Sequence, residues 1–358
     1  MREVGAPLSI ETLELDEPHE REALVRIAAA GVCHSDLHLM KGDWPIPLPA
    51  VLGHEGSAVV EQVGPGVTTV KPGDHCILVF APNCGHCAYC SAGRPMLCTG
   101  HGRRPPGTML DGTNRLSSSG TSVSHMAAVA CFAEHAVIAE EQLLVIESSI
   151  PLDKAALVGC SVTTGVGAVV NTARVEPGAT VAVIGCGGVG LSVIQGARLA
   201  GAARIVAIDL FDEKLEKATS MGATDIVNAN DGDVVKQVHK LTNGGADYAF
   251  DAIGMAATVK QSLDLVRAGG KAVVVGIGRF GEGTPIDAFS LVMQEKALLG
   301  CFYGSSRPRI DMPRILDLYR RGRLQLDELV TRRYPLDQIN EAYADLQSSQ
   351  AGRGVIVF

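Results

Sequence analysis

The sequence lacks the features that mark several classes of protein. Its 31 Lys and Arg residues are outnumbered by 39 Asp and Glu residues, and the net charge of −8 disfavours a nucleic-acid or anionic-membrane partner. The N-terminal segment, MREVGAPLSIETLELDEPHEREALV, is charged and has no apolar signal core. No apolar run reaches the roughly 20 residues that a membrane span needs, and no repeat of solenoid period is visible. These absences predict a cytoplasmic protein.

The chain is long enough for two domains. It contains 358 residues, of which 46% are hydrophobic and 20% charged, an ordinary globular balance. Ten Cys residues in a chain without a signal segment predict a reducing compartment, where thiols serve as ligands more often than as bridges.

Four cysteines lie close together in the run CGHCAYCSAGRPMLC, with the pattern C-x2-C-x2-C-x7-C: Cys84, Cys87, Cys90 and Cys98. Four thiolates at this spacing can close a tetrahedral shell around one Zn²⁺ and leave no open position, which predicts a structural zinc lobe over residues 84–98. The alternative is a disulfide cluster in a secreted chain.

The pattern of apolar residues changes along the chain. Up to about Pro151, short β segments alternate with Gly-Pro and Pro-Gly turns, and residues 102–125 form a loop rich in Gly, Pro and Ser. Between residues 162 and 302, apolar strands such as TVAVIG, RIVAID and KAVVVGIG alternate with helices, as in a doubly wound parallel sheet. We therefore predict an α/β protein in which the α/β domain, 162–302, is inserted into a β-rich domain formed by 1–161 and 303–358.

A Gly-rich turn follows the strand TVAVI and begins a helix. Its G-x-G-x-x-G pattern consists of Gly185, Gly187 and Gly190, with Gly188 and Val189 between them. Asp209 ends the next strand roughly 20 residues later, the spacing of a dinucleotide site. The turn would hold a pyrophosphate at the helix N-terminus, and Asp209 would bind the adenosine ribose and repel a 2′-phosphate, which favours NAD(H). Lys214 could assist at the same ribose; a Gly-rich turn without a cofactor is the alternative.

Three further residues could form a second zinc site: Cys33 in GVCHSDLH, His54 in LGHEG and Cys160 in LVGCSVTTG. A Cys₂His set leaves a fourth position for water or substrate. A zinc ion there would lower the pKa of a bound alcohol, so that an alkoxide could pass a hydride to a nicotinamide. Each residue alone could equally be a buried thiol or a hydrogen-bonded imidazole.

Taken together, these motifs resemble the zinc-dependent medium-chain alcohol dehydrogenases over essentially the whole chain. The matching segments are GVCHSD, GHEGSAVVEQVGPGV, KPGDHC, the four-Cys lobe, GCSVTTG, GCGGVG and GRGVIVF. The resemblance implies a GroES-like catalytic domain, a Rossmann coenzyme domain and an active site in the cleft between them. It assigns Cys33, His54 and Cys160 to a catalytic zinc and the four-Cys lobe to a structural zinc.

The resemblance also implies roles for residues around the catalytic zinc. Ser35 matches the hydroxyl that binds the substrate oxygen, and His38 the histidine that relays its proton to solvent; a surface helix residue is the alternative for His38. Asp36 and Glu55 match carboxylates that support the ligands, one of which should orient His54.

Further matches concern the cofactor. His34 and Arg353 match phosphate contacts, although either could be a solvated cation. Thr164 and Val189 should pack around the nicotinamide, and the backbone at Val275 and Ile277 should bind its carboxamide.

The substrate is less well defined. The resemblance places Phe80 and Trp44, the single Trp, beside the zinc, which favours a medium-chain or aromatic primary alcohol or its aldehyde; Trp44 could instead be a packing residue at the pocket mouth. S-(hydroxymethyl)glutathione (formaldehyde) dehydrogenase and secondary-alcohol or ketone reductase are alternatives within the family. Trp44 replaces an acidic pocket residue of the glutathione-dependent class, and Arg103 and Arg104 lie near the position of its carboxylate-binding Arg.

Two rival classes use the same scaffold. A zinc-independent reductase of activated double bonds would lack the Cys₂His set, and a non-enzymatic protein would lack a ligand or the relay. The family forms dimers or tetramers, often through the edges of the coenzyme-domain sheets. A homodimer or homotetramer is therefore expected, with the strand near Phe302 as a candidate edge.

Overall fold

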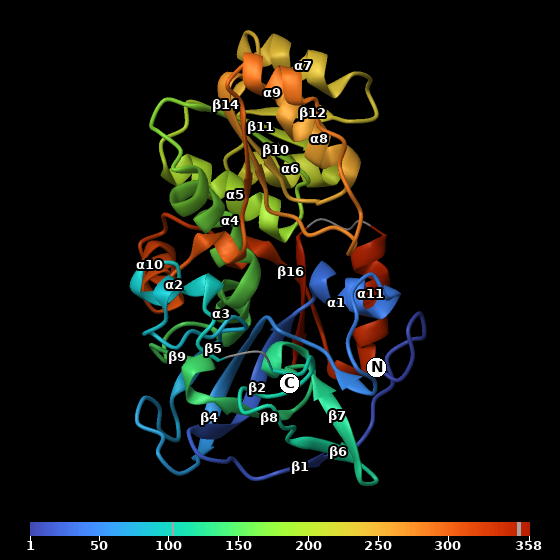
Figure 1. The fold of residues 1–358 in the computed structure, drawn as a ribbon, viewed down its shortest axis with the longest axis vertical. Helices are drawn as coiled ribbons and strands as arrows, with labels where there is room; N and C mark the ends of the chain where they lie inside the picture. Colours follow the sequence, from blue (N-terminus) through green and yellow to red (C-terminus); the bar gives the residue numbers. More distant parts are fainter. Residues whose placement is uncertain (102–103, 349–351) are drawn as a thin grey trace.

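The computed structural model describes residues 1–101, 104–348 and 352–358 and has two lobes stacked along its long axis (Figure 1). The upper lobe contains a parallel sheet in the strand order β12-β11-β10-β13-β14-β15. Its strands are β10 (Thr180–Ile184), β11 (Arg204–Asp209), β12 (Asp225–Asn228), β13 (Ala246–Asp251), β14 (Val266–Val274) and β15 (Ala297–Gly300). The order reverses after β10, so the carboxyl ends of β10 and β13 form the switch point where dinucleotides bind in such sheets.

Helices cover both faces of this sheet because successive strand residues point to opposite sides. Val181 and Val183 pack in one core cluster with residues of α5 (Gly188–Leu199) and α6 (Asp212–Met221). Ala182 and Ile184 pack in another with residues of α7 (Val234–Thr242) and α8 (Ala256–Leu265). A further short helix, α9 (Ala288–Met293), precedes the edge strand β15. The prediction of a doubly wound parallel sheet is confirmed.

The lower lobe is built mainly from antiparallel strands contributed by both ends of the chain. One sheet has the order β16-β17-β2-β4-β5-β9, with β8 also paired to β2. Its strands are β2 (Glu22–Gly31), β4 (Gly56–Val63), β5 (His75–Leu78), β8 (His135–Ala139), β9 (Leu143–Ile146), β16 (Val330–Tyr334) and β17 (Arg353–Val357). A second sheet has the order β1-β6-β7-β3, formed by β1 (Glu14–Leu15), β6 (Leu116–Ser118), β7 (Thr121–His125) and β3 (Ala50–Val51).

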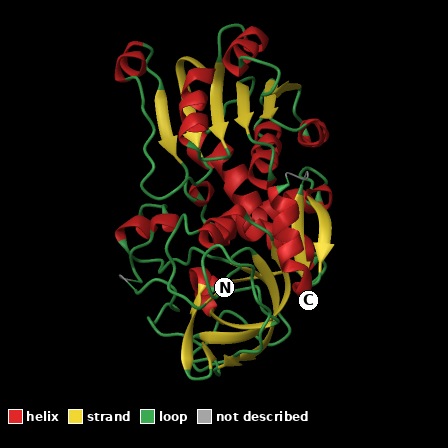
Figure 2. Ribbon diagram, turned by 90° about the vertical axis from the view of Figure 1, so that its right-hand side faces the viewer, coloured by secondary structure: helices red, strands yellow, loops and turns green. Residues whose placement is uncertain are grey.

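Helical segments fill the space between the two lobes and flank the lower one (Figure 2). The helices are α1 (His34–Lys41), α2 (Ala88–Ser91), α10 (Pro308–Arg320) and α11 (Ile339–Gln347). The short helical turns are η1 (Pro95–Leu97), η2 (Met126–Ala128), η3 (Glu140–Gln142), η6 (Tyr303–Ser305), η7 (Asp327–Leu329) and η8 (Leu336–Gln338).

One helical run links the two lobes: α3 (Leu152–Leu157), the π-helical η4 (Val158–Val162), α4 (Thr163–Gly167) and the π-helical η5 (Ala168–Ala173). The predicted domain boundary after residue 161 falls inside this run. Contrary to the sequence-based expectation, Leu152–Ala173 is long and apolar enough to cross a membrane by length and composition, but 83% of its apolar window is buried inside the protein. It is therefore a core helix of this fold.

The described part of the predicted loop, residues 104–125, contains regular structure. Their second half forms the hairpin of β6 and β7. Arg115, just before β6, is only 1% exposed and pairs with Glu22 at 2.7 Å. The prediction of a loop over residues 102–125 was wrong for residues 116–125. The strands there are short, so Gly, Pro and Ser residues dominate the local composition. Arg103 lies outside the described residues, and Arg104 donates to the carbonyl of Thr108.

Candidate active site and zinc sites

Three buried residues from distant segments meet between the lobes. Cys33 directly precedes α1, His54 precedes β4, and Cys160 lies in η4. One ligand atom from each of them lies within 4.8 Å of the others. This is the Cys₂His set predicted from the sequence.

The local backbone around Cys160 departs from a regular α-helix. The π-helical turn η4 contains both Cys160 and Ser161, and extra-wide turns of this kind often occur at functional sites. The hydroxyl of Tyr303 donates to the carbonyl of Gly159 at 2.6 Å, which helps to hold the turn.

The side chains of this cluster fit a metal ion. Nε2 of His54 is buried and has no hydrogen-bond partner among the described residues. Nδ1 of His54 lies 3.2 Å from the Asp36 carboxylate; burial disfavours the charged imidazole, but Asp36 outweighs it and raises the pKa of His54 well above its usual value. A hydrogen bond from Cys160 holds the pKa of the Cys33 thiol well below its usual value, although burial opposes this. A thiolate and an imidazole with a fixed orientation are ligands that Zn²⁺ prefers.

Glu55 and Arg353 form a buried pair behind the cluster. Glu55 accepts hydrogen bonds from the backbone amide of Ser161 at 2.9 Å and from its hydroxyl at 2.7 Å, and its other oxygen pairs with the Arg353 guanidinium. Burial raises the pKa of Glu55, although Arg353 opposes the shift. Of the two carboxylates predicted to support the ligands, Asp36 therefore contacts His54, whereas Glu55 holds the turn that carries Cys160.

Arg353 reaches from this pair to the Gly-rich turn. It is 4% exposed, and a Cβ on Gly188 would lie 2.3 Å from its Cδ. Arg353 was predicted to contact a phosphate, but in this structure its guanidinium is already paired with Glu55. The sequence does not reveal this pair, because the two residues are 298 positions apart.

Helix α1 carries the residues predicted to handle the substrate proton. Ser35 Oγ lies 3.7 Å from Cys33 Sγ. Nδ1 of His38 lies 2.9 Å from the Asp43 carboxylate, and the His38 ring stacks on Trp44 with ring centroids 4.7 Å apart. His38 is thus held by two neighbours, of which Asp43 was missed in the sequence because it carries no motif of its own.

Aromatic rings line the other side of the Cys₂His cluster. The ring of Phe80 lies edge-on to that of His54 with centroids 5.3 Å apart. The centroid of the Phe80 ring lies 4.1 Å from that of Tyr303 and 6.3 Å from that of Phe302. Phe80 was predicted to lie here, whereas Phe302 and Tyr303 were not. They follow β15 in the sequence and reach this place only through the chain's return to the lower lobe.

The Gly-rich turn between β10 and α5 has the geometry of a phosphate cradle. Gly185 has a φ of 89°, and a Cβ on Gly190 would lie 1.7 Å from the Gly185 carbonyl oxygen, so both positions require glycine. A Cβ on Gly187 would meet nothing within 4 Å among the described residues, so this side of the turn is open to a ligand. The helix that follows offers free amides and a positive dipole end at the same point.

Asp209 stands at the carboxyl end of β11, beside this turn. Its carboxylate accepts a hydrogen bond from the amide of Cys186 at 2.7 Å and another from Leu210 at 2.8 Å. Lys214, one turn into α6, lies over the ring of Phe211 at 5.2 Å from the centroid. The Cys186 thiol is fully buried, and burial raises its pKa, as expected for a packing residue.

The remaining predicted cofactor residues line the same region. Thr164 lies on α4, which packs closely on α5: a Cβ on Gly165 would lie 2.5 Å from the carbonyl oxygen of Val189. Val275 is 4% exposed and Ile277 is 49% exposed, both in the segment after β14. His34 is exposed at the start of α1, yet enough protein surrounds it to lower its pKa to about 4, and Arg353 and Lys214 act in the same direction. His34 is therefore neutral at pH 7 in this structure.

The four-Cys lobe forms a second cluster, in which one ligand atom from each residue lies within 4.8 Å of the others. Backbone amides donate to the sulfurs: Cys84 N to Cys98 Sγ, Cys87 N to Cys84 Sγ and Gly100 N to Cys98 Sγ, each at 3.3 Å. Hydrogen bonds from the amides of Cys90 and Thr99 lower the pKa of Cys87 to about 5. All ten cysteines are free thiols, so this structure does not support the disulfide alternative.

Comparison with known proteins identifies the family. Residues 19–148 match the alcohol dehydrogenase GroES-like domain, and residues 188–321 match the zinc-binding dehydrogenase domain. The NDMA-dependent alcohol dehydrogenase of Amycolatopsis methanolica is 40% identical over 100% of this chain and 97% of its own. The chain belongs to the zinc-dependent medium-chain alcohol dehydrogenase family.

Two other proteins illustrate the range of this family. The S-(hydroxymethyl)glutathione dehydrogenase of Saccharomyces cerevisiae is 39% identical over 98% of this chain and 93% of its own. The crystal structure of benzyl alcohol dehydrogenase from Acinetobacter calcoaceticus superposes with a TM-score of 0.92 at 33% identity, covering 99% of this chain and 96% of the other. The predicted GroES-like and Rossmann domains are confirmed, and the protein is an oxidoreductase of the alcohol or formaldehyde dehydrogenase type that uses zinc and a nicotinamide cofactor.

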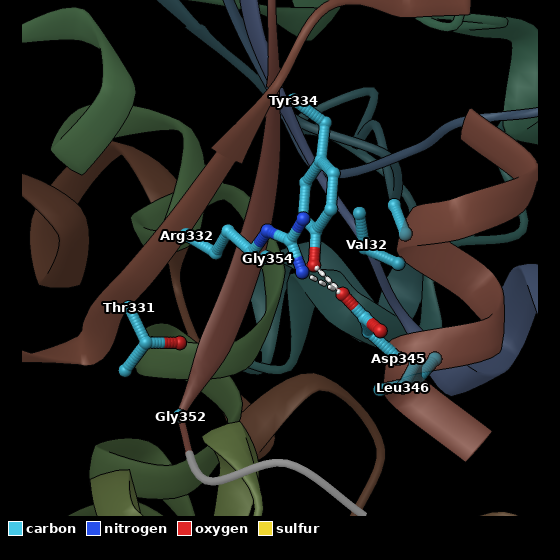
Figure 3. A pocket seen from close by; sticks show the side chains of 9 residues that line it. Val32, Thr331, Arg332, Tyr334, Asp345, Leu346, Gly352 and Gly354 are labelled. Carbon is cyan, nitrogen blue, oxygen red and sulfur yellow. Dashed lines mark hydrogen bonds and ion pairs between the residues drawn. The ribbon is translucent and has the colours of Figure 1, made fainter. Parts of the chain in front are cut away.

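A small pocket lies between β16, β17 and α11, and its lining includes no residue of either cysteine cluster (Figure 3). Its volume of about 20 Å³ is room for about one water molecule. Asp345 occupies its wall, accepting hydrogen bonds from Tyr334 at 2.6 Å and from Arg332. The pocket is too small for an alcohol dehydrogenase substrate, and its polar groups satisfy one another.

Proposed function

We propose that the protein is an NAD(H)-dependent alcohol dehydrogenase that interconverts a medium-chain or aromatic primary alcohol and its aldehyde, with one catalytic and one structural zinc ion per chain. The observation that carries the proposal is the buried cluster of Cys33, His54 and Cys160, which adjoins Ser35 on one side and Phe80 on the other. A Cys₂His set leaves one position of a tetrahedral ion open to a substrate.

When bound at these residues, zinc would supply Lewis-acid polarisation of an oxygen, and NAD⁺ would supply a hydride acceptor. The chain's own residues position the reactants and move the proton. Ser35, next to Cys33, would accept a hydrogen bond from the alcohol, and His38, one turn further along α1, would pass the proton to water. An imidazole suits this step because its usual pKa, about 6.5, lies near neutral pH.

Asp209 supports a preference for NAD(H). Its carboxylate stands beside the Gly-rich turn with both oxygens near the backbone of Cys186 and Leu210. A ribose hydroxyl can donate to a carboxylate, whereas the 2′-phosphate of NADP(H) would be repelled by it. Lys214, in the first turn of α6, would assist at the same ribose.

The aromatic rings around Phe80 support an apolar substrate. Phe80, Phe302 and Tyr303 form a cluster that begins at the His54 ring, so a phenyl group beside the zinc would find edge-on and stacked partners. The high structural similarity to a benzyl alcohol dehydrogenase supports the same choice.

A homo-oligomer is part of the proposal. β15 lies at the edge of the parallel sheet, next to exposed apolar side chains on α9: Phe289 at 74%, Val292 at 72% and Met293 at 67% exposure. A second copy that extends the sheet at this edge would cover them and remove the unpaired strand. The location that suits ten free thiols is the reducing cytoplasm.

The test is a substrate panel with zinc-loaded protein and either NAD⁺ or NADP⁺, in which NADH or NADPH formation is followed by absorbance. We expect turnover of benzyl alcohol and medium-chain aliphatic alcohols with NAD⁺. The panel includes formaldehyde with glutathione, because the yeast relative named for S-(hydroxymethyl)glutathione makes that reaction the second candidate. Turnover of that adduct alone would replace the primary-alcohol assignment, and no turnover of any substrate would refute both.

A further inference from the structure

Asp43 lies where the two lobes meet, in the segment between α1 and β3. One of its carboxylate oxygens lies 2.9 Å from Nδ1 of His38, and the other accepts a hydrogen bond from Nε of Arg279 at 2.7 Å. Arg279 belongs to the segment after β14 in the upper lobe. A single carboxylate therefore connects the relay histidine of one lobe to a cation of the other.

A second contact crosses the same boundary beside it. The indole Nε1 of Trp44 donates to the carbonyl of Gly278 at 3.0 Å, and the Trp44 ring stacks on His38 with an interplanar angle of 24°. Asp43 and Trp44 thus hold the imidazole at one edge and over one face, and the segment at residues 278–279 holds both of them.

The chemistry of the Asp43 pair fixes which nitrogen of His38 carries a proton. Hydrogen bonds from His38 and Arg279 lower the pKa of Asp43, so its carboxylate is ionised at neutral pH and can only accept. Nδ1 of His38 must then be the donor, which leaves Nε2 as the nitrogen that can take up a proton. Arg279 is 67% exposed, so the ion pair adds little to stability and its effect is on orientation.

We propose that Asp43 is a positioning residue that sets the tautomer and orientation of His38 for proton transfer, and that Arg279 makes this dependent on contact between the two lobes. The inference rests on the proposed function: alcohol oxidation gives a hydride to NAD⁺ and releases one proton, and Nε2 of His38 accepts that proton before passing it to water. Asp43 itself takes no part in bond making.

The kinetic test compares four variants of the zinc-loaded protein with wild type: Asp43→Asn, His38→Gln, the double variant, and Asp264→Asn as a matched control. Asp264 is paired with Lys260 at 2.6 Å on the surface of α8, away from the cluster. We expect Asp43→Asn to lower kcat for benzyl alcohol about tenfold with KM unchanged, and the double variant to be no slower than His38→Gln. Added imidazole should restore kcat in Asp43→Asn, because a mobile base replaces a misplaced one.

A second measurement does not depend on turnover. In ¹⁵N-labelled protein, the His38 resonances, assigned by their loss in His38→Gln, should report an Nδ1-protonated ring in wild type and a mixed or reversed tautomer in Asp43→Asn. Trp44 emission, from the only Trp in the chain, shows whether each variant keeps its local packing.

The outcomes test the positioning role of Asp43 separately from the proposed alcohol dehydrogenase activity. Wild-type kcat in Asp43→Asn, or effects of Asp43→Asn and His38→Gln that multiply in the double variant, would overturn the positioning role. So would a tautomer that does not change. If wild-type protein oxidises no alcohol, the proposed function fails, and the tautomer measurement still supports or refutes the control of His38 by Asp43.

Discussion

Asp36 places a carboxylate oxygen 3.2 Å from Nδ1 of His54, in a position where neither side chain is exposed by more than 4%. The other Asp36 oxygen accepts a hydrogen bond from the amide of Gly53 at 2.8 Å. The carboxylate is thus fixed by the backbone and lies against Nδ1 of the imidazole, while Nε2 has no hydrogen-bond partner among the described residues and is available to a metal ion. Metal-bound histidines commonly have such a partner.

The first prediction concerns this pair. Asn in place of Asp36 could still accept from Gly53, but it would offer His54 no negative charge. We expect Asp36→Asn to weaken zinc binding at this site by about 10- to 100-fold, measured by competition with a chromophoric chelator. The control is Glu61→Gln, which removes one carboxylate of the exposed pair with Arg26. Unchanged zinc affinity in Asp36→Asn would contradict the orienting role.

The second prediction concerns the four-Cys lobe. A Cβ on Gly100 would lie 2.1 Å from Cys84 Sγ and 2.6 Å from Cys84 Cβ, so Cys84 would have to move away from the cluster. We expect Gly100→Ala to lose one zinc per chain, measured by metal analysis of the purified protein, while Cys33, His54 and Cys160 keep theirs. Gly283→Ala, at a glycine whose Cβ would meet nothing within 4 Å among the described residues, should retain both ions.

The cysteine spacing and the Gly-rich turn with its Asp could be interpreted from the sequence because their residues are close together along the chain. The parallel sheet could be predicted because its alternation of strand and helix is regular. The partners of these residues are distant, and nothing local indicates them: Asp43 joins Arg279, and Glu55 joins Arg353 across 298 positions. Phe302 and Tyr303 likewise reach Phe80 only through tertiary folding.

The hairpin at 116–125 was missed for a different reason. Its strands β6 and β7 are short, and Gly120 and the Ser residues around it are typical of a loop. The buried guanidinium of Arg115, which has no sequence signature, ties the start of the segment to Glu22. Charged residues are seldom fully buried unless paired, so the sequence favours an exposed position.

The third prediction tests that guanidinium. Arg115 donates to both oxygens of Glu22, at 2.8 and 2.7 Å, and both side chains are buried. Arg115→Ala would leave the Glu22 carboxylate buried without its partner, which costs about 3–5 kcal/mol of the free energy of unfolding. Arg26→Ala, at the exposed pair with Glu61, should cost about 1 kcal/mol or less. Urea denaturation measures both, and equal effects would refute the structural role of Arg115.

The fourth prediction concerns pH. Burial acts to raise the pKa of Asp111, but hydrogen bonds from Arg115 and Thr113 outweigh it and lower the pKa to about 2. Because the folded pKa lies below the unfolded value, the stabilisation is complete above about pH 4 and is lost as the pH falls towards 2. The stability difference between wild type and Asp111→Asn should therefore be constant at pH 5–7 and shrink on acidification. A difference that grows below pH 4 would have the wrong sign.

The fifth prediction concerns cofactor preference. Asp209→Gly removes the carboxylate beside the Gly-rich turn, so NADP⁺ is no longer repelled and NAD⁺ loses its ribose partner. We expect the ratio of kcat/KM for NAD⁺ over NADP⁺ to fall at least about tenfold, since one charge-assisted hydrogen bond and one repulsion change together. Asp225→Asn, on the neighbouring strand in a pair with Arg204, is the control and should leave the ratio unchanged.

We propose that Cys33, His54 and Cys160 hold the zinc ion on which alcohol oxidation depends. The most direct measurement is metal content together with NAD⁺-linked benzyl alcohol oxidation, before chelation, after chelation and after return of Zn²⁺, in wild type and Cys160→Ser. We expect two zinc ions and full activity in wild type, with loss of both on chelation and recovery with Zn²⁺. We expect one zinc ion and no recovery of activity in Cys160→Ser. Full activity in Cys160→Ser, or in protein freed of zinc, would contradict it.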